Sequence, residues 1–301
     1  MNTVELSGVP SLSRLYVAAA AAAARNRMSK DNGQTELPNV RHEVGSVPID
    51  VERLTQYQHL LHEPARDTVP SGFIHAMAFP VAINVMTAED FPLPLLGMLH
   101  LNNHVEHYRP VLFTERLDIS AWPQNMTGHR AGTQMEMAVE VRTSGELVWR
   151  AVSTYLAKGV HLPGLDTGSG TKPVREDFTP PPPTAKWRLG VDVGRSYAAV
   201  SGDFNPIHLS GITARALGMR QSIAHGMYLA SRVLAGARPD GVEAFSWDIE
   251  FAAPVYLPGT VALSVKDRDE NRESFSGIDY VAWNPKSARK HFSGSVTPLV
   301  T

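Results

Sequence analysis

The sequence contains no cysteine. Disulfide bonds, thiolate nucleophiles and thiolate metal sites are therefore excluded, and the composition suits a reducing cytoplasm. A surplus of charge is also lacking, because 28 basic residues stand against 30 acidic ones and leave a formal net charge of −2. Without an overall positive field, the chain is not expected to bind nucleic acid or an anionic membrane, and an anionic ligand must meet a local patch.

Long apolar runs are missing as well. The one segment that resembles a targeting signal is an alanine run at residues 17–24, which is only weakly apolar and far too short to span a bilayer. Alanine is the best helix former. We therefore expect a helix over residues 12–28 with Ser11 as its N-cap, in preference to a cleaved signal.

The chain does contain enough apolar material for a sizeable core, since 43% of its 301 residues are hydrophobic. That length suits one large domain or two of ordinary size. The clearest break is a Gly- and Pro-rich stretch at residues 161–183, whose four consecutive prolines favour a semi-rigid spacer over helix or strand. We expect an N-terminal domain over residues 1–160 and a C-terminal domain over residues 184–301.

A weak internal repeat relates the two halves. The apolar segment 73–86 resembles segment 222–235, which places His75 beside His225, and strand-like sequence farther on repeats at a similar offset. Such self-similarity predicts two copies of one fold.

Each copy has a helical segment followed by extended ones. Segments 133–143 and 146–159 alternate polar with apolar and β-branched residues, which is typical of antiparallel strands. Separate helix and strand blocks indicate an α+β architecture. One long helix covered by a curled antiparallel sheet, present twice, satisfies this order.

The residues that indicate chemistry lie in segment 197–208, YAAVSGDFNPIH. Its helical opening must end in a sharp turn, because Pro206 interrupts regular helix and biases Asn205 toward an extended conformation. The turn lets Asp203 and His208 aim at one spot, whereas a continuous helix would splay side chains five positions apart. A carboxylate and an imidazole on one water molecule form an acid/base pair.

Hydration of an enoyl thioester requires a base for the water proton, an acid for the α-carbon and donors for the enolate oxygen. Asp203 and His208 can share the first two roles, and Asn205 can hold the pair or the water. Gly226, at the start of an apolar helix, offers an open backbone N–H to the oxyanion. No metal or cofactor is required.

A simpler explanation exists for an Asp-x-Asn-Pro sequence taken alone, since Asp203 could cap the helix that runs on toward Leu217. Here the turn is preceded by Ser201 and followed by an Ile-Ala-His-Gly-Met segment that contains His225. That context favours a catalytic site.

Segment 197–208, followed by AHGM, resembles the hydratase signature of the MaoC-like dehydratases, also called R-specific enoyl-CoA hydratases. The stretches PSLSRLYVAAA, FPLPLLGMLHLNNHVEHYRP and ELVWRAVSTYL resemble the longer, two-domain bacterial members, which are double hotdog folds. The resemblance implies that Asp203 and His208 are the catalytic pair. The supporting residues it implies are Asn205, Gly226, Ser201 and His225, with the Gly226 N–H in the oxyanion hole.

The resemblance also implies unequal halves. Tyr57 matches Tyr197, but no Gly-Asp-x-Asn-Pro-x-His sequence follows it. The first copy is therefore expected to be catalytically inert and to shape the groove for the acyl chain. One departure is Leu234, which stands where short relatives have a serine that hydrogen-bonds the substrate.

The expected reaction is reversible hydration of trans-2-enoyl thioesters and dehydration of (R)-3-hydroxyacyl thioesters. The carrier is coenzyme A or acyl carrier protein, whose phosphates or acidic surface a basic patch would meet. Candidates are Arg215, Arg220 and Arg232, although solvated surface arginines explain them more simply. A monomer and a homodimer are both compatible with an internal duplication.

Competing interpretations stay open at this point. A hotdog acyl-CoA thioesterase would share the fold, and a non-catalytic acyl-binding subunit would share the groove. A metal site at His100, His104 and His107 is disfavoured, because strand alternation turns His104 and His107 to opposite faces. His75 lacks an acidic partner in its half, so we expect a buried remnant of the repeat rather than a second base.

Overall fold

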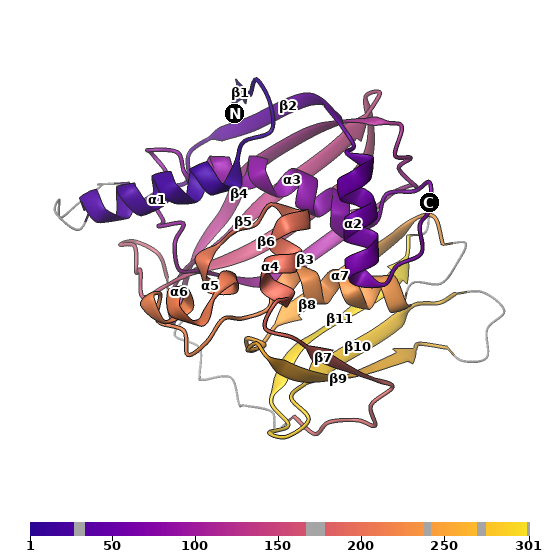
Figure 1. The fold of residues 1–301 in the computed structure, drawn as a ribbon. Helices are drawn as coiled ribbons and strands as arrows, with labels where there is room; N and C mark the ends of the chain where they lie inside the picture. Colours follow the sequence, from indigo (N-terminus) through magenta and orange to yellow (C-terminus); the bar gives the residue numbers. More distant parts are fainter. Residues whose placement is uncertain (27–33, 167–177, 238–241, 270–274, 300–301) are drawn as a thin grey trace.

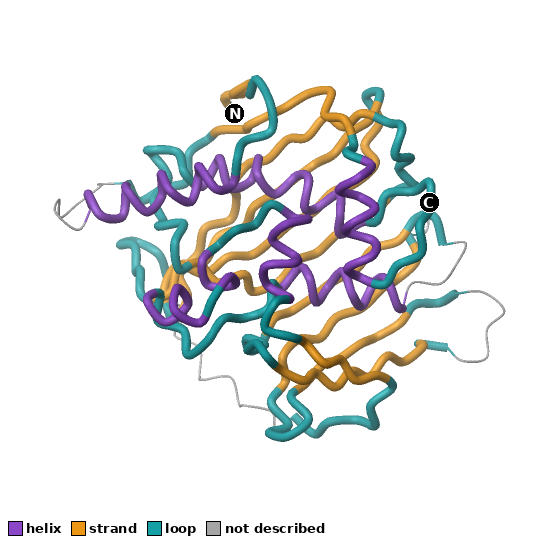
Figure 2. The backbone as a smooth tube through the Cα atoms, in the orientation of Figure 1, coloured by secondary structure: helices purple, strands orange, loops and turns teal. Residues whose placement is uncertain are grey.

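The computed structural model describes residues 1–26, 34–166, 178–237, 242–269 and 275–299. Within these residues the strands form one continuous sheet of eleven, in the order β1-β2-β4-β5-β6-β3-β8-β11-β10-β9-β7. The sheet curls, and the helices lie against one of its faces (Figures 1 and 2).

The strands of the first half are β1 (Asn2–Glu5), β2 (Val40–Pro48), β3 (Met98–His107), β4 (Arg116–His129), β5 (Gly132–Thr143) and β6 (Glu146–Lys158). Those of the second half are β7 (Ala185–Leu189), β8 (Phe245–Phe251), β9 (Gly259–Asp267), β10 (Ile278–Trp283) and β11 (Lys290–Pro298). The helices are α1 (Leu12–Asn26), α2 (Val51–Leu61), α3 (Ser71–Met86), α4 (Val193–Ser201), α5 (Pro206–Leu209), α6 (Gly211–Ala216) and α7 (Gly226–Ala237).

The strand order shows the duplication directly. Inside the edge strand β1, the first half contributes β2-β4-β5-β6-β3, and the second half contributes β7-β9-β10-β11-β8, each counted inward. The copies meet where β3 and β8 pair antiparallel, with Asn103 opposite Ile249 and Val105 opposite Trp247. The expected α+β double hotdog is confirmed, and so is the antiparallel pairing of β5 with β6.

A central helix lies in the concave side of each copy. The sequence of α3, SGFIHAMAFPVAINVM, is apolar on every side, and nearly all of the helix is buried, as expected of a helix that the sheet wraps around. The repeat also brings Tyr57 of α2 and Tyr197 of α4 together. Both rings are buried, with centroids 6.2 Å apart, so the matched tyrosines form part of the contact between the copies.

The N-terminal helix begins at Leu12, as expected, and the structure describes it to Asn26. Its expected end at Met28 lies outside the described residues, as does segment 167–177 of the expected linker. The domain boundaries at residues 160 and 184 stay a prediction. In the part of the chain that the structure describes, no helix combines the length and apolarity needed to cross a membrane.

Candidate active site

The predicted sharp turn lies between α4 and α5. Gly202 ends α4 with a φ of 79°, a left-handed conformation that glycine adopts without strain. Asn205 is extended, with φ −56° and ψ 124°, and Pro206 is the first residue of α5. Proline fits that position because its missing N–H would have no intrahelical acceptor.

Hydrogen bonds between residues close in sequence hold this turn in shape. The Asp203 N–H donates to Ser201 Oγ at 3.2 Å, and the Asn205 N–H donates to Asp203 Oδ1 at 3.2 Å. The Asn205 side chain caps α5 by accepting from the Ile207 N–H at 3.4 Å. The capping role that Asp203 alone could have had belongs to Asn205, and Ser210 caps the following helix α6.

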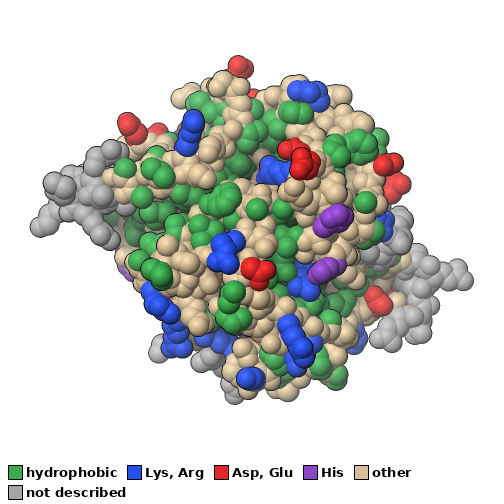
Figure 3. All heavy atoms as spheres, viewed as in Figure 1, with side chains coloured by type: hydrophobic (Ala, Val, Ile, Leu, Met, Phe, Trp, Pro, Cys, Tyr) green, Lys and Arg blue, Asp and Glu red, His purple; other side chains and the backbone are tan. Residues whose placement is uncertain are grey.

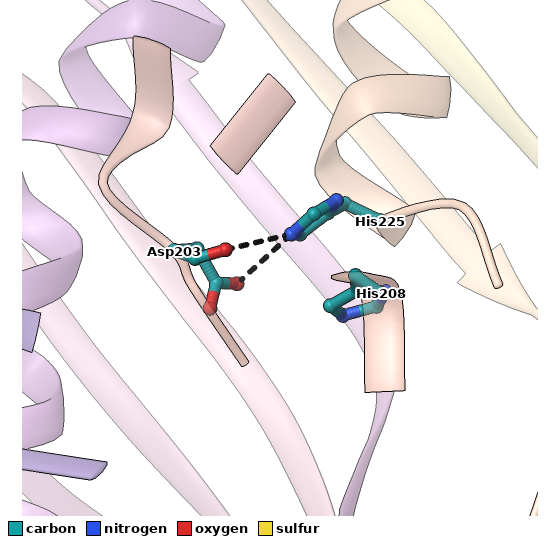
Figure 4. A group of neighbouring side chains, drawn as sticks. All are labelled: Asp203, His208 and His225. Atoms are coloured by element: carbon teal, nitrogen blue, oxygen red, sulfur yellow. Dashed lines mark hydrogen bonds and ion pairs between the residues drawn. The ribbon is translucent and has the colours of Figure 1, made fainter. Parts of the chain in front are cut away.

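The turn and the start of α7 bring three side chains together. Asp203, His208 and His225 each present a side-chain oxygen or nitrogen, and these atoms all lie within 4.8 Å of one another. The imidazole rings of His208 and His225 stack with centroids 3.6 Å apart. In Figure 4 the Asp203 carboxylate points toward the two rings, and dashed lines join Asp203 to His225.

Burial fixes the protonation of His208. Desolvation, with a smaller contribution from neighbouring His225, lowers the pKa of His208 to about 3, so the ring is neutral near pH 7. Its Nδ1 lies 2.9 Å from the Ile223 carbonyl oxygen. Because a carbonyl can only accept, Nδ1 carries the proton and Nε2 keeps a lone pair. His208 is thus neutral and can accept a proton at Nε2.

His225 is hydrogen-bonded to the turn. Burial lowers the pKa of His225 to about 4. Its Nε2 lies 2.9 Å from the Asp203 backbone oxygen and 3.9 Å from Asp203 Oδ2. The neutral ring therefore donates from Nε2 to the Asp203 backbone, which ties the turn to the start of α7.

Two residues of the first half, neither of them predicted from the sequence, also hold the turn. Tyr16 of α1 donates from its phenol to Asp203 Oδ1 at 2.7 Å. Arg53 of α2 donates to the carbonyl oxygens of Val200 and Ser201 at 2.6 and 2.9 Å, where a cation stabilises the end of α4. The partners are 187 positions apart for Tyr16 and 147 for Arg53 and Val200. No local sequence pattern indicates such contacts.

A cavity of about 300 Å³ opens beside these residues. Its polar lining includes Asp203, Asn205 and His208 from the second half. The apolar lining comes from both halves, including Phe79, Ile83 and Met86 of the first and Ile223, Met227 and Phe251 of the second. The cavity therefore combines a few polar side chains, suited to a reacting group, with an apolar lining from both copies.

Two glycines are required by close packing at the site. A Cβ on Gly226 would lie 2.7 Å from the Phe251 ring, and one on Gly194 would lie 2.0 Å from the His208 carbonyl oxygen. Gly226 also lines the cavity and begins α7, so its N–H is one that a helix leaves without an intrahelical acceptor. That position suits a donor to an oxyanion.

The cluster Asp203–His208–His225 is the only group in the described residues with the composition of a metal site. The His225 nitrogen that approaches the Asp203 carboxylate is Nε2, at 3.9 Å from Oδ2, and it carries a proton because it faces the Asp203 carbonyl, while His208 keeps a lone pair on Nε2. The two stacked rings lie nearly parallel, at 25°, rather than converging on one point. The donor set fits acid/base chemistry better than metal binding.

The histidines of β3 are separated. His104 pairs with Asp248 at 2.6 Å across the β3–β8 seam, while His100 stacks on Tyr155 and His107 on Phe245. These contacts disfavour a shared ion.

His75 is buried beside Phe79, and burial lowers its pKa to about 3. It lines the same cavity from the first half, so the expected remnant of the repeat lies within reach of a ligand.

The candidate arginines differ in position. Arg215 and Arg220 are exposed and contact each other through an Arg215 Nε to Arg220 carbonyl hydrogen bond, next to Met219, which lines the cavity. Arg232 instead lies over the Trp187 ring at 4.9 Å and donates to the Tyr228 phenol. Figure 3 shows basic side chains gathered over the α5–α6 and β7 part of this face.

Leu234 packs near Tyr57 and Ser231, away from the cavity that Asp203 lines.

Comparison with known proteins gives consistent findings. A family model described as a MaoC like domain matches residues 181–288. The 3-hydroxyacyl-thioester dehydratase X of Mycobacterium tuberculosis is 31% identical over 264 residues, which are 88% of this chain and 91% of that protein.

Solved structures agree. The crystal structure of HtdX of M. tuberculosis superposes with a TM-score of 0.74 at 29% identity, over 86% of this chain and 100% of that one. A MaoC-like dehydratase of Phytophthora capsici gives a TM-score of 0.69 at 17% identity, over 88% of this chain and 97% of that one, a likeness of fold.

Proposed function

The chain belongs to the MaoC-like dehydratases and is a hydro-lyase of acyl thioesters in fatty-acid metabolism, and we propose that Asp203 and His208 carry its chemistry. One observation carries the proposal. The carboxylate of Asp203 and the imidazole of His208 come from either side of one turn, lie within 4.8 Å of each other and line one cavity. One water molecule can bridge such a gap.

The hydrogen bonds around the pair support a defined arrangement of that water. Asp203 Oδ1 already accepts from Tyr16 and from the Asn205 N–H, which leaves Oδ2 for the cavity. His208 Nε2 keeps its lone pair because Nδ1 donates to Ile223. Two acceptors thus meet the two O–H groups of one water and direct its oxygen toward the substrate.

Hydration then needs one proton transfer in each direction. As the water oxygen attacks the β-carbon, the Asp203–His208 pair takes a proton, and electrons move through the double bond to the thioester oxygen. The Gly226 N–H at the start of α7 stabilises that oxygen. The proton held by the pair goes to the α-carbon, so the substrate gains one OH and one H. Dehydration is the reverse.

The substrate is a trans-2-enoyl or (R)-3-hydroxyacyl thioester. The apolar lining, to which α3 and the segment before β3 contribute, suits the hydrocarbon part of the acyl group. Arg215 and Arg220, beside Met219 at the cavity, suit the phosphates of coenzyme A or the acidic surface of an acyl carrier protein. A cytoplasmic setting and a homodimer stay predictions.

The test is to mix the purified protein with crotonyl-CoA and with a medium-chain trans-2-enoyl-CoA. Loss of enoyl absorbance, with (R)-3-hydroxyacyl-CoA as the product on chiral analysis, supports the proposal. Release of free thiol would mean a thioesterase, the (S)-product would overturn the stereochemistry, and binding without turnover would indicate an acyl-binding subunit.

A further inference from the structure

The N-terminal helix α1 lies directly over the catalytic turn. Leu12 is buried, and its Cδ1 would lie 3.7 Å from a Cβ on Gly202. Tyr16 stands one helical turn farther on the same face of α1 and reaches Asp203 Oδ1 at 2.7 Å. These two contacts join α1 of the first half to the proposed catalytic carboxylate of the second half, 187 positions away from Tyr16.

We infer that Tyr16 is a positioning residue for the hydro-lyase reaction, which orients the Asp203 carboxylate by donating to Oδ1 and so directs Oδ2 to the water. The inference rests on the proposed function of Asp203. It gives the first half a part in the chemistry beyond shaping the acyl pocket.

The surroundings of Tyr16 favour this role over simple anchoring of α1. The side chain is 8% exposed and lines the cavity, so bulk water competes little for the carboxylate. Burial, with the nearby Asp203 carboxylate as the next cause, raises the pKa of Tyr16 well above its ordinary value. The phenol therefore keeps its proton at every working pH and remains a donor.

A carboxylate with one fixed oxygen has little rotational freedom. Oδ1 accepts from Tyr16 and from the Asn205 N–H, and the backbone of Asp203 is held by Ser201 and His225. Without the phenol, only the Asn205 N–H would hold Oδ1, and the carboxyl group could turn about its last bond. Misorientation of a reacting group lowers the rate of the chemical step more than the binding of substrate.

The test compares Tyr16→Phe with Tyr108→Phe, a matched control whose phenol donates to Glu106 at 2.8 Å away from the cavity. We expect Tyr16→Phe to lower kcat by about tenfold to a hundredfold, the worth of a hydrogen bond to a charged group. The KM for crotonyl-CoA should change by less than about twofold, as expected when only the chemical step is affected. Tyr108→Phe should match the native enzyme in both.

A double-mutant cycle separates positioning from structure. If Tyr16 acts through Asp203, Tyr16→Phe adds no further loss of kcat in an Asp203→Asn background. Equal losses in both backgrounds, or a raised KM with a lowered Tm and unchanged kcat, would overturn the inference. Native enzyme that shows no hydration, or Asp203→Asn with full activity, would instead refute the proposed function.

Discussion

At the scale of single residues, the buried histidines govern how the protein responds to acid. Burial lowers the pKa values of His75 and His208 to about 3 and that of His225 to about 4. Each is neutral in the folded state at a pH where the unfolded chain, with an ordinary pKa of about 6.5, binds a proton. Below about pH 6.5 the unfolded state therefore binds more protons than the folded state does.

The free energy of unfolding should consequently fall between about pH 6.5 and pH 4, by up to about 1.4 kcal/mol per pH unit for each of these histidines. Urea denaturation at pH 7, 6 and 5 measures this free energy of unfolding. His75→Gln should reduce the slope, whereas His59→Gln, on the exposed face of α2, should leave it unchanged. A stability independent of pH over this window would contradict the neutral, buried state of these rings.

The sequence was informative about individual residues where chemistry is local. Asp203, Asn205 and His208 are close in sequence, and Pro206 shows that the chain must turn between them, so their convergence could be predicted. Tyr16 and Arg53 could not be found in this way. Their partners are set by how α1 and α2 pack against the second half, and no spacing in the chain encodes that contact.

At the scale of elements, the position of His208 depends on how closely α4 packs against α5. Gly194 in the first turn of α4 leaves room for the His208 carbonyl, which a Cβ would approach to 2.0 Å. Real Cβ atoms do not approach backbone oxygen so closely, and backbone cannot yield as a flexible side chain can. The fit between α4 and α5 is therefore part of the site.

We expect Gly194→Ala to displace α5 and to lower kcat/KM by about a hundredfold, the effect of a shift of roughly 1 Å in a reacting group. Gly236→Ala is the matched control, because this glycine of α7 has open space around it. Alanine there should stabilise the helix by about 0.5–1 kcal/mol and leave activity intact. Equal activity of the two variants would show that α4 does not position His208.

The sequence also predicted the positions of several helices and strands. The helix start at Leu12 and the strands β5 and β6 follow from alanine content and from alternation. The pairing of β3 with β8 into one continuous sheet did not follow, because edge pairing between copies depends on their relative placement. The polar strand residues His104 and Asp248 meet only as a result of that pairing.

At the scale of the whole molecule, the two copies divide the cavity between them. Ile83 of α3 belongs to the first copy and lines the same cavity as Asp203 and His208 of the second copy. The duplication could be inferred from the repeat, but the depth of the pocket could not, since it depends on the packing of both copies.

Replacing Ile83 with phenylalanine should narrow the apolar part of the cavity. We expect kcat/KM for a medium-chain enoyl-CoA to fall at least about tenfold, because an overfilled pocket costs about 1–3 kcal/mol. The value for crotonyl-CoA should remain within about twofold, so the short substrate serves as the internal control. An equal loss for both substrates would mean that the first copy does not bind the acyl chain.

The most direct measurement of the central claim is the rate of enoyl absorbance loss for Asp203→Asn beside Asp279→Asn. Asp279 is an exposed aspartate of β10 that pairs with Arg268 at 2.7 Å, and surface ion pairs of this kind contribute little. The account predicts that Asp203→Asn lowers kcat by about 10²–10⁴ with an unchanged Tm, while Asp279→Asn matches the native rate. Full hydratase activity in Asp203→Asn would place the chemistry elsewhere and contradict the account.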